Sequence, residues 1–296
     1  MDDYNILKNA AEKMDWISDE FCGHTKCNDS RMKAVDGSDN CHWYHSSWMH
    51  LRLAGIVVSE DYLGEYYEQF FRERKQQDVI NVLICGMADF ATLNHVVRRI
   101  PKEMIHKVII TLVDICQSPI ELCKWYVETY NIFPVNQLRY VIADATNMPF
   151  ENNSFDLITN YSFLTRMVLS EMKKVIDEWN RVLKPKGCIY TTIHINSDPS
   201  NVKGAFYRSS SSSVSYAMNK VEEYIKQNKL TLEKADSMRS KCKLYLNNIM
   251  SVSIPSESFI INIFKGFNCN FESRNQPGEL EAIHKMVLLK AVKSYE

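Results

Sequence analysis

The chain has 296 residues, of which 45% are hydrophobic and 24% charged, and its formal net charge is -1. These values are typical of soluble globular proteins and exclude a collagenous or broadly disordered chain. The near balance of 35 basic and 36 acidic side chains argues against nucleic-acid binding through bulk charge. The composition therefore predicts a compact protein of enzyme size that does not act on nucleic acid.

Features of targeted or exported proteins are missing from the sequence. The first residues are acidic, where a secretory signal would carry positive charge and then an apolar core. No apolar run approaches the roughly 20 residues that a membrane-spanning helix needs. The nine cysteines form an odd number without regular spacing, which does not favour a disulfide framework. We therefore expect a cytoplasmic protein without a membrane partner.

The N-terminal part of the chain, residues 1–78, has helical periodicity and many aromatic side chains but no run typical of a strand. Aromatic residues recur every four positions over 61–74, which predicts an amphipathic helix there. Tyr44, Trp48 and Arg52 have the same spacing, so they would share one face of an earlier helix. We expect 1–78 to form a helical segment of its own.

From residue 79 the pattern changes to short apolar runs that alternate with helical segments. The predicted strands are 79–85, 108–113, 138–142, 155–159 and 188–194. The predicted helices between them are 90–100, 119–130 and 171–183. Such alternation predicts a parallel sheet with helices on both faces, connected by right-handed crossovers.

The alternation stops after residue 195. Residues 196–215 are polar and include five consecutive serines, which predicts a loop. Three helices follow, over 217–227, 234–249 and 259–264. Ser256 is the expected N-cap of the last one. The last two apolar runs predict an antiparallel pair of strands at the sheet edge, over 267–273 and 283–292, which makes seven strands in all.

Candidate ligand-binding residues follow the predicted strands. In an open parallel sheet, ligands bind at the carboxyl ends of the strands, near the point where strand order reverses. Gly86 follows the first strand, where it would let the backbone approach a ligand. Asp114 ends the second strand, where a carboxylate can accept hydrogen bonds from ribose hydroxyls. Taken alone, such a glycine also fits an ordinary turn, and such an aspartate also fits a helix cap.

Three segments stand in a recognisable order: Asp144-Ala-Thr-Asn-Met-Pro-Phe150, Ser154-Phe-Asp-Leu-Ile158 and Val182-Leu-Lys-Pro-Lys-Gly187. Together they resemble the class I S-adenosylmethionine-dependent methyltransferases, in particular the small-molecule branch with the ubiquinone and menaquinone enzymes. The resemblance implies an α/β, Rossmann-like, doubly wound sheet of seven strands with a reversed last strand. It covers the cofactor-binding core, 79–195 and 256–296. Residues 1–78 and 196–255 lie outside the resemblance. We expect the first to form an N-terminal helical lid and the second a helical insert that acts as the substrate lid, because this family often builds lids at these places.

The same resemblance implies S-adenosylmethionine as the cofactor. The core residues implied to contact it are Gly86, Met87, Ala88, Asp89, Asp114, Ile115, Asp144, Ala145 and Tyr161. The glycine loop would meet the methionine part, Asp114 the ribose and Asp144 the adenine. From the lid, Tyr44 and Trp48 would cover the sulfonium by cation–π contact, and Arg52 would bind the carboxylate. The alternative is that this helix only packs on the sheet.

The glycine loop departs from the family pattern. Ala88 and Phe90 stand where the second and third glycines are usual, and Ile84 stands where the first strand usually carries an acidic residue. Asp89 is then the candidate for the missing carboxylate. The departure leaves two alternatives open. One is an enzyme that cyclises or transfers the aminocarboxypropyl chain and releases methylthioadenosine, and the other is a non-catalytic adenosyl-binding module.

Two residues are candidates for catalysis. Methyl transfer needs an acceptor atom in line with the sulfonium methyl, so the protein mainly positions and desolvates the reactants and sometimes supplies a base. His194, at the end of the fifth strand, has an ordinary pKa suited to a base, although it also suits a structural hydrogen bond to the following loop. Tyr161, after the fourth strand, fits a pocket-shaping role better than proton transfer. The acceptor is expected to be a small molecule of unspecified kind.

A group of cysteines and histidines near the N-terminus could in principle form a metal-binding site. The residues are Cys22, His24, Cys27, Cys41, His42 and His45. The Cys22-x4-Cys27 spacing is possible for zinc, but the second pair is irregular, and neighbours on a helix such as Cys41 and His42 point apart. The sequence therefore does not favour a metal site.

Overall fold

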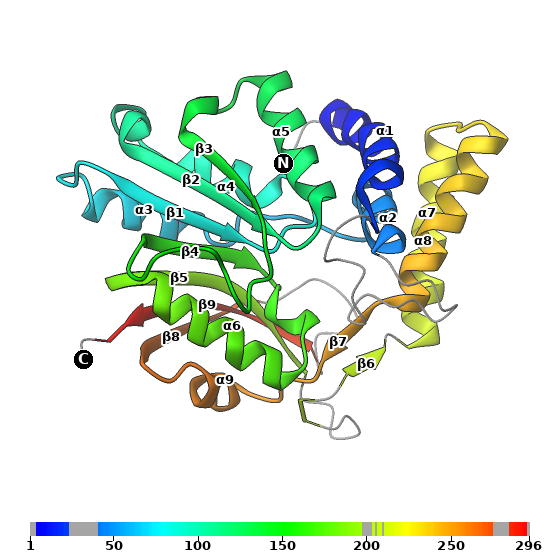
Figure 1. Cartoon of the computed structure of the whole chain (residues 1–296). Helices are drawn as coiled ribbons and strands as arrows, with labels where there is room; N and C mark the ends of the chain where they lie inside the picture. Colours follow the sequence, from blue (N-terminus) through cyan, green and yellow to red (C-terminus); the bar gives the residue numbers. More distant parts are fainter. Residues whose placement is uncertain are drawn as a thin grey trace.

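A seven-stranded sheet with the strand order β3-β2-β1-β4-β5-β9-β8 forms the centre of the molecule (Figure 1). The computed structural model describes residues 4–23, 41–196, 203–204, 206–208, 210–274 and 284–294. The strands of this sheet are β1 (Ile80–Cys85), β2 (Val108–Asp114), β3 (Leu138–Ile142), β4 (Phe155–Tyr161), β5 (Leu183–Asn196), β8 (Phe267–Arg274) and β9 (His284–Lys293). β1 to β5 run parallel, and β9 lies antiparallel between β5 and β8. The predicted Rossmann-like fold class is confirmed.

Successive side chains of the strands face two separate apolar cores. Val82 and Ile84 of β1 face the core on the side of α3, α4 and α5, whereas Leu83 and Cys85 face the core under α6 and α9. Because neighbouring side chains of a strand point to opposite faces, a strand covered on both sides has to be apolar throughout. These helices are α3 (Gly64–Glu73), α4 (Ala91–Arg99), α5 (Gln117–Tyr130), α6 (Leu169–Val182) and α9 (Glu257–Ile263).

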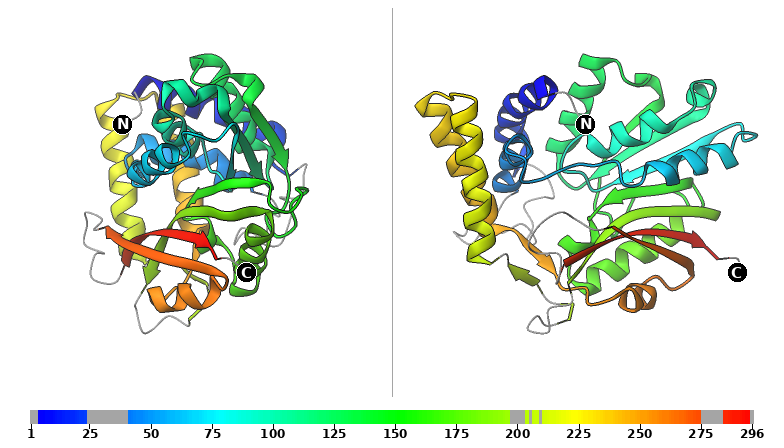
Figure 2. Two further views of the ribbon diagram at one scale, coloured as in Figure 1. Left: turned by 90° about the vertical axis from the view of Figure 1, so that its left-hand side faces the viewer. Right: turned by 180° about the vertical axis from the view of Figure 1, so that it is seen from behind.

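Four further helices lie beyond the carboxyl ends of the parallel strands, as Figures 1 and 2 show from three sides. They are α1 (Tyr4–Phe21), α2 (His42–Leu53), α7 (Ser211–Gln227) and α8 (Leu232–Asn248), and we call them the helical cover. Trp43 of α2, Val221 of α7 and Tyr245 of α8 belong to a third apolar cluster of buried side chains. Residues far apart in the sequence thus build one cover over the sheet.

Short elements complete the described structure. A two-stranded sheet pairs β6 (Phe206–Arg208) with β7 (Met250–Val252). The 3-10 helices are η2 (Lys102–Lys107), η3 (Val135–Gln137) and η4 (Leu164–Arg166). Within the described residues, no helix combines the length and the apolar composition needed to span a membrane.

The predicted core elements are confirmed, with small shifts at their ends, but the loop expected over 196–215 is partly wrong. Residues 206–208 form β6, and α7 begins at Ser211. The hydroxyl of Ser210 accepts a hydrogen bond from the backbone N–H of Ser213 and so caps the helix. Serine is favoured at this position because its oxygen satisfies a free N–H, so the serine run marks a helix start. The turn expected between β8 and β9 lies outside the described residues.

Candidate functional site

A cavity of about 420 Å³ lies between the carboxyl ends of the strands and the helical cover. Its volume is within the range of about 300–1,000 Å³ that is typical of small-molecule sites. β1 and β4 are neighbours in the sheet, and the strand order reverses between them, which is where ligands bind in such folds. The core residues that line the cavity include Gly86, Met87, Ala88, Asp89, Asp114, Ile115, Tyr161, Phe163, Thr192 and His194.

Gly86 is held in a conformation that other residues rarely adopt. Its φ angle is +74°, in the left-handed region that favours glycine. A Cβ atom at this position would lie only 2.1 Å from a ring carbon of Phe163. Its N–H also donates to the carbonyl oxygen of Val113 at 2.9 Å. The glycine therefore allows the ring to pack against the loop backbone, and both residues line the cavity.

Asp114 is the buried carboxylate at the end of β2. Its oxygens accept hydrogen bonds from the backbone N–H groups of Met87 and Cys116, each at 2.8 Å. Burial raises its pKa to about 7, although the charge of His45 and the two backbone hydrogen bonds act in the other direction. Each carboxylate oxygen retains a further acceptor position. Asp114 thus fits the role of accepting hydrogen bonds from the ribose hydroxyls of a nucleoside.

Asp89 connects the glycine loop to the helical cover. Its Oδ2 accepts hydrogen bonds from Trp48 Nε1 at 2.7 Å and from Arg52 Nη1 at 2.9 Å, and its Oδ1 accepts the N–H of Ala91, the first residue of α4. Arg52 and Asp89 are both buried. Arg52 is not among the described residues that line the cavity. The structure therefore gives Arg52 a partner within the protein, and its contact with a cofactor carboxylate stays a prediction.

Aromatic rings from the helical cover form one wall of the cavity. Tyr44 and Trp48 are stacked, with ring centroids 5.5 Å apart, and Tyr245 lies 5.4 Å from Tyr44 and 6.0 Å from Trp48. Burial raises the pKa of both tyrosines, so the wall is uncharged at neutral pH. Rings of this kind bind cations through their faces. Tyr245 was missing from the predicted site because only the packing of α8 on α2 brings it there.

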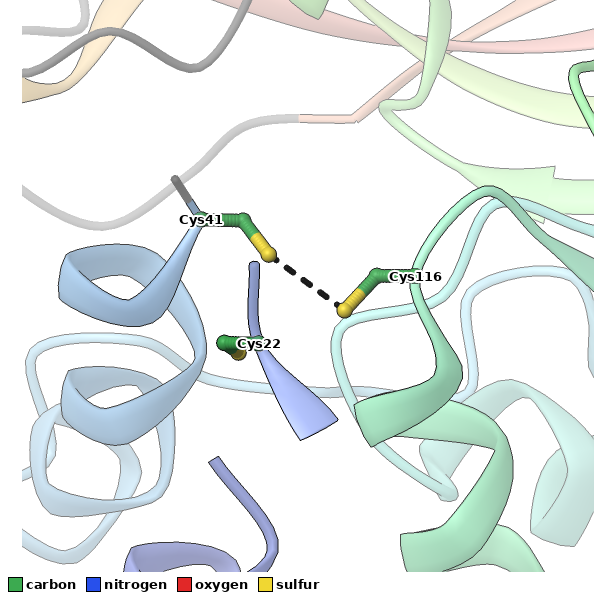
Figure 3. A group of neighbouring side chains, drawn as sticks. All are labelled: Cys22, Cys41 and Cys116. Carbon is green, nitrogen blue, oxygen red and sulfur yellow. Dashed lines mark hydrogen bonds between the residues drawn. The ribbon is translucent and has the colours of Figure 1, made fainter. Parts of the chain in front are cut away.

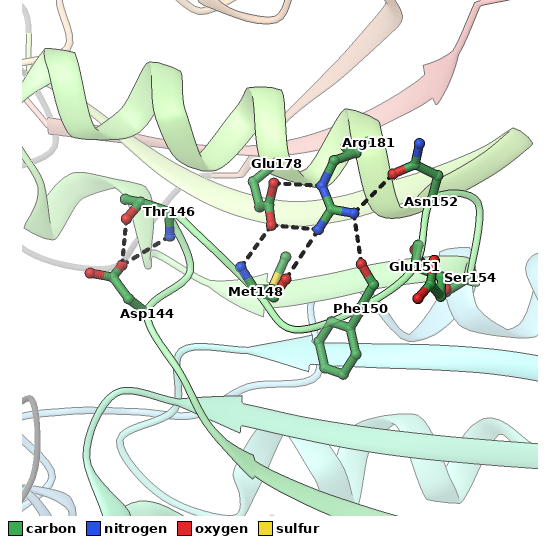
Figure 4. Close-up of polar contacts among 9 residues, drawn as sticks. All are labelled: Asp144, Thr146, Met148, Phe150, Glu151, Asn152, Ser154, Glu178 and Arg181. Carbon is green, nitrogen blue, oxygen red and sulfur yellow. Dashed lines mark hydrogen bonds and ion pairs between the residues drawn. The ribbon is translucent and has the colours of Figure 1, made fainter.

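Asp144 and Ala145 follow β3 but are not among the described residues that line the cavity. The Oδ1 atom of Asp144 accepts hydrogen bonds from the backbone N–H of Thr146 at 2.9 Å and from its hydroxyl at 2.8 Å (Figure 4). This carboxylate thus shapes the turn after β3. The predicted contact with adenine stays a prediction.

The loop that carries the Asp144 motif is fixed by a pair of charged residues on α6. Arg181 donates hydrogen bonds to the carbonyl oxygens of Met148 at 3.1 Å and Phe150 at 2.6 Å, and it pairs with Glu178 at 2.7 Å (Figure 4). Glu178 in turn accepts the N–H of Met148 at 2.7 Å. The hydrogen bond from Arg181 holds the pKa of Glu178 below its usual value, against the effect of burial.

The two candidate catalytic residues, Tyr161 and His194, both line the cavity. The hydroxyl oxygen of Tyr161 accepts the N–H of Leu63 at 3.3 Å, and its ring packs edge-on against His95. Burial raises the pKa of Tyr161, so its hydroxyl is protonated at neutral pH, as expected for a pocket-shaping residue. His194 is half-buried at the end of β5.

Arg166 was missed by the sequence reasoning. It lines the cavity, and its Nη1 donates hydrogen bonds to the carbonyl oxygen of Met250 at 2.9 Å and to the hydroxyl of Ser251 at 2.8 Å. It therefore anchors β7 to η4 and brings a positive charge to the cavity. The sequence holds no signal for this role, because β7 is a short strand that follows Arg166 by more than eighty residues.

Comparison with known proteins identifies the class of the core. Residues 88–191 match the model of a family described as a methyltransferase domain. A 54-residue segment is 48% identical to the demethylmenaquinone methyltransferase of Clavibacter sepedonicus, and a 49-residue segment is 45% identical to an uncharacterised protein of Haemophilus influenzae. These segments make up 18% and 17% of this chain, and they span only about a fifth of each relative, 21% and 20%.

Among the solved structures to which this chain is similar is the N-methyltransferase NodS of Bradyrhizobium japonicum, in complex with S-adenosylhomocysteine. It is 12% identical with a TM-score of 0.45, over 78% of this chain and 87% of that one. The family match carries the assignment: residues 88–191 belong to a methyltransferase domain. The predicted family, enzyme class and cofactor of that domain are confirmed. The match begins at residue 88, after Gly86, which agrees with the departure of the glycine loop from the family pattern.

Proposed function

We propose that the protein transfers the methyl group of S-adenosylmethionine to a small-molecule acceptor. The observation that carries this proposal is a single cavity that contains both the Asp114 carboxylate and the aromatic wall of Tyr44, Trp48 and Tyr245. The first suits the nucleoside end of the cofactor, and the second suits its sulfonium. When bound, the cofactor supplies an electrophilic methyl group.

The roles of the protein in this reaction are to bind, to orient and to exclude water. Asp114 would hold the ribose hydroxyls, and the Gly86 loop would lie against the methionine part. The helical cover, from the segments 1–78 and 196–255, would act as the lid that closes over both reactants and removes water from the reacting atoms. His194 would accept a proton from the acceptor where the acceptor atom carries one.

The setting that we infer is cytoplasmic. It is supported by the cysteines of the sequence, which form an odd number without the regular spacing of a disulfide framework, as expected in reducing surroundings. The near-neutral charge of the chain, formally -1, favours a small molecule over nucleic acid as the partner. The cavity volume agrees with this class of substrate.

The aminocarboxypropyl reaction remains the second candidate because of the Gly86 loop. This loop lacks the second and third glycines of the family pattern, and Phe163 packs directly on Gly86, where the methionine chain would pass. A reaction at the aminocarboxypropyl group of the cofactor would need such a changed environment around that group. A non-catalytic adenosyl-binding module is the third candidate, and the loss of the loop glycines favours it equally.

The experiment that separates these candidates is incubation of the purified protein with S-adenosylmethionine and a metabolite extract, followed by mass spectrometry of the nucleosides. We expect S-adenosylhomocysteine with a methylated product. Calorimetric titration of the cofactor into an Asp114→Asn variant should show affinity reduced by about 10- to 100-fold, because hydrogen bonds to a charged group are lost. Methylthioadenosine above the spontaneous background would instead establish a reaction at the aminocarboxypropyl group. Binding of the cofactor without any product would favour the non-catalytic adenosyl-binding module.

Asp156→Asn is the matched control. Asp156 is also a buried carboxylate, but it lies at the start of β4, where it accepts the N–H of Asn81 and pairs with Lys184 at 2.8 Å. Its substitution should lower stability without a specific loss of cofactor affinity. Equal losses of affinity in both variants would mean that Asp114 acts through the fold, and the proposed ribose contact would be wrong.

A further inference from the structure

Cysteines from distant parts of the sequence meet beside the cavity. Cys22 follows α1, Cys41 precedes α2 and Cys116 precedes α5, and Figure 3 shows the side chains converging. The sulfur atoms of all three lie within 4.8 Å of one another, and those of Cys41 and Cys116 are 3.3 Å apart. All three residues are buried. They form an apolar cluster of their own, apart from the three larger ones.

We propose that Cys22, Cys41 and Cys116 bind a zinc ion through three thiolates. Zinc–sulfur bonds of about 2.3 Å in tetrahedral geometry place the sulfur atoms roughly 3.8 Å apart, which agrees with separations of 3.3 Å to at most 4.8 Å. Thiolate ligands favour zinc among the common divalent metals. Small adjustments of the side chains are enough to bring the three sulfurs to one ion.

Two of the cysteines lie at helix N-termini. Cys41 is the N-cap residue of α2, and Cys116 is the N-cap residue of α5. The positive end of a helix stabilises a negative sulfur. On binding, each thiol loses its proton to the solvent and forms a sulfur–zinc bond, without any change in oxidation state. The ion then balances most of the negative charge that three buried thiolates would bring.

A fourth ligand is available from the cavity. Cys41 and Cys116 line the same cavity as Gly86 and Asp114, so a water molecule or a donor atom of a bound substrate can complete the coordination. Zinc sites with three protein ligands and one exchangeable position are typical of catalytic zinc. The site would also fasten the helical cover to the core, because α1 and α2 pack on each other and α1 packs on α5.

The proposal is tested by the metal content of the full chain, purified without chelator and measured by inductively coupled plasma mass spectrometry. We expect about one zinc per chain, and a reduction of at least about tenfold in Cys22→Ser and Cys116→Ser, because two thiolates hold zinc far more weakly than three. Cys269→Ser is the control, since Cys269 lies half-exposed on the edge strand β8. It should retain the zinc of the wild-type chain.

A second measurement uses the wild-type chain, so that the proposal is tested even if the cysteine variants fail to fold. The wild-type chain is stripped with a chelator and titrated with Co²⁺. Thiolate-to-cobalt charge-transfer absorption should appear and then vanish when Zn²⁺ is added. A wild-type chain that contains no zinc and shows no such absorption would overturn the proposal. A Cys41–Cys116 disulfide in the freshly purified chain, found by peptide mapping, would overturn it as well. Neither result bears on cofactor binding, which is tested separately above.

Discussion

At the scale of single residues, the contact between Gly86 and Phe163 joins the carboxyl ends of β1 and β4 inside the site. The positive φ of Gly86 and the lack of space beside it are separate constraints. Gly55 has a similar φ of +66°, but nothing lies within 4 Å of the Cβ position there. The two glycines therefore allow the cost of backbone conformation to be separated from the cost of crowding.

Gly55→Ala should lower the free energy of unfolding by about 1–2 kcal/mol, because only the left-handed conformation is penalised. Gly86→Ala should cost about 1–3 kcal/mol more, since the new methyl group also meets the ring of Phe163. Urea denaturation of both variants measures the difference. In a Phe163→Ala background the extra cost at Gly86 should disappear. An unchanged cost in that background would show that the ring does not limit position 86.

At the scale of elements, the loop after β3 depends on the Glu178–Arg181 pair of α6. Glu178→Gln should lower the free energy of unfolding by about 1–2 kcal/mol at neutral pH, because a charged hydrogen-bond partner of Arg181 and Met148 is lost. The pKa of Glu178 in the folded chain lies below its ordinary value of 4.5. Its contribution is therefore full above that pH and is lost as the pH falls through the folded pKa.

The difference in stability between the wild type and Glu178→Gln should accordingly shrink below pH 4.5. Denaturation by urea at a series of pH values measures it. Glu222→Gln is the matched control, since Glu222 pairs with Arg239 on the exposed surface, where ion pairs contribute little. A pH-independent difference, or an equal loss in both variants, would mean that the loop does not rely on this pair.

Most elements of the sheet were predictable because their signals are local. Strands such as Val108–Asp114 are apolar throughout, and helices such as α6 alternate with them at the expected spacing. The start of α9 was predictable for the same reason, since the side chain of Ser256 accepts the N–H of Phe259, as expected of an N-cap residue. The start of α7 was not, because serines are typical of both loops and helix caps, and only the helix that follows distinguishes them.

The site was predictable in part. Residues at the carboxyl ends of the strands, such as Gly86 and Asp114, reach the cavity because parallel strands end at one edge of the sheet. Residues that depend on packing between distant segments were missed, as with Tyr245 and Arg166. The meeting of Cys22 and Cys41 with Cys116 was missed for the same reason, because no spacing in the sequence reports the approach of α1 to α5.

At the scale of the whole molecule, the helical cover should respond to the cofactor. Hydrogen exchange of backbone amides, followed by mass spectrometry, should slow by about tenfold or more in α2 and α8 when S-adenosylmethionine is added, because a ligand that contacts both segments opposes their local opening. β8 lies at the far edge of the sheet and should be unaffected. Protection confined to the loops after β1 and β2 would show that the cover does not act as a lid.

The assembly of the cover from distant segments also bears on how the chain is made. The apolar face of α2, with Trp43, leaves the ribosome early, but its partners Val221 and Tyr245 are synthesised only after β5. Until α7 and α8 have been synthesised, this face lacks these two partners, because domains fold as their segments emerge. Late mutations in α7 or α8 should therefore reduce the yield of newly made protein more than their effect on the finished fold alone would suggest.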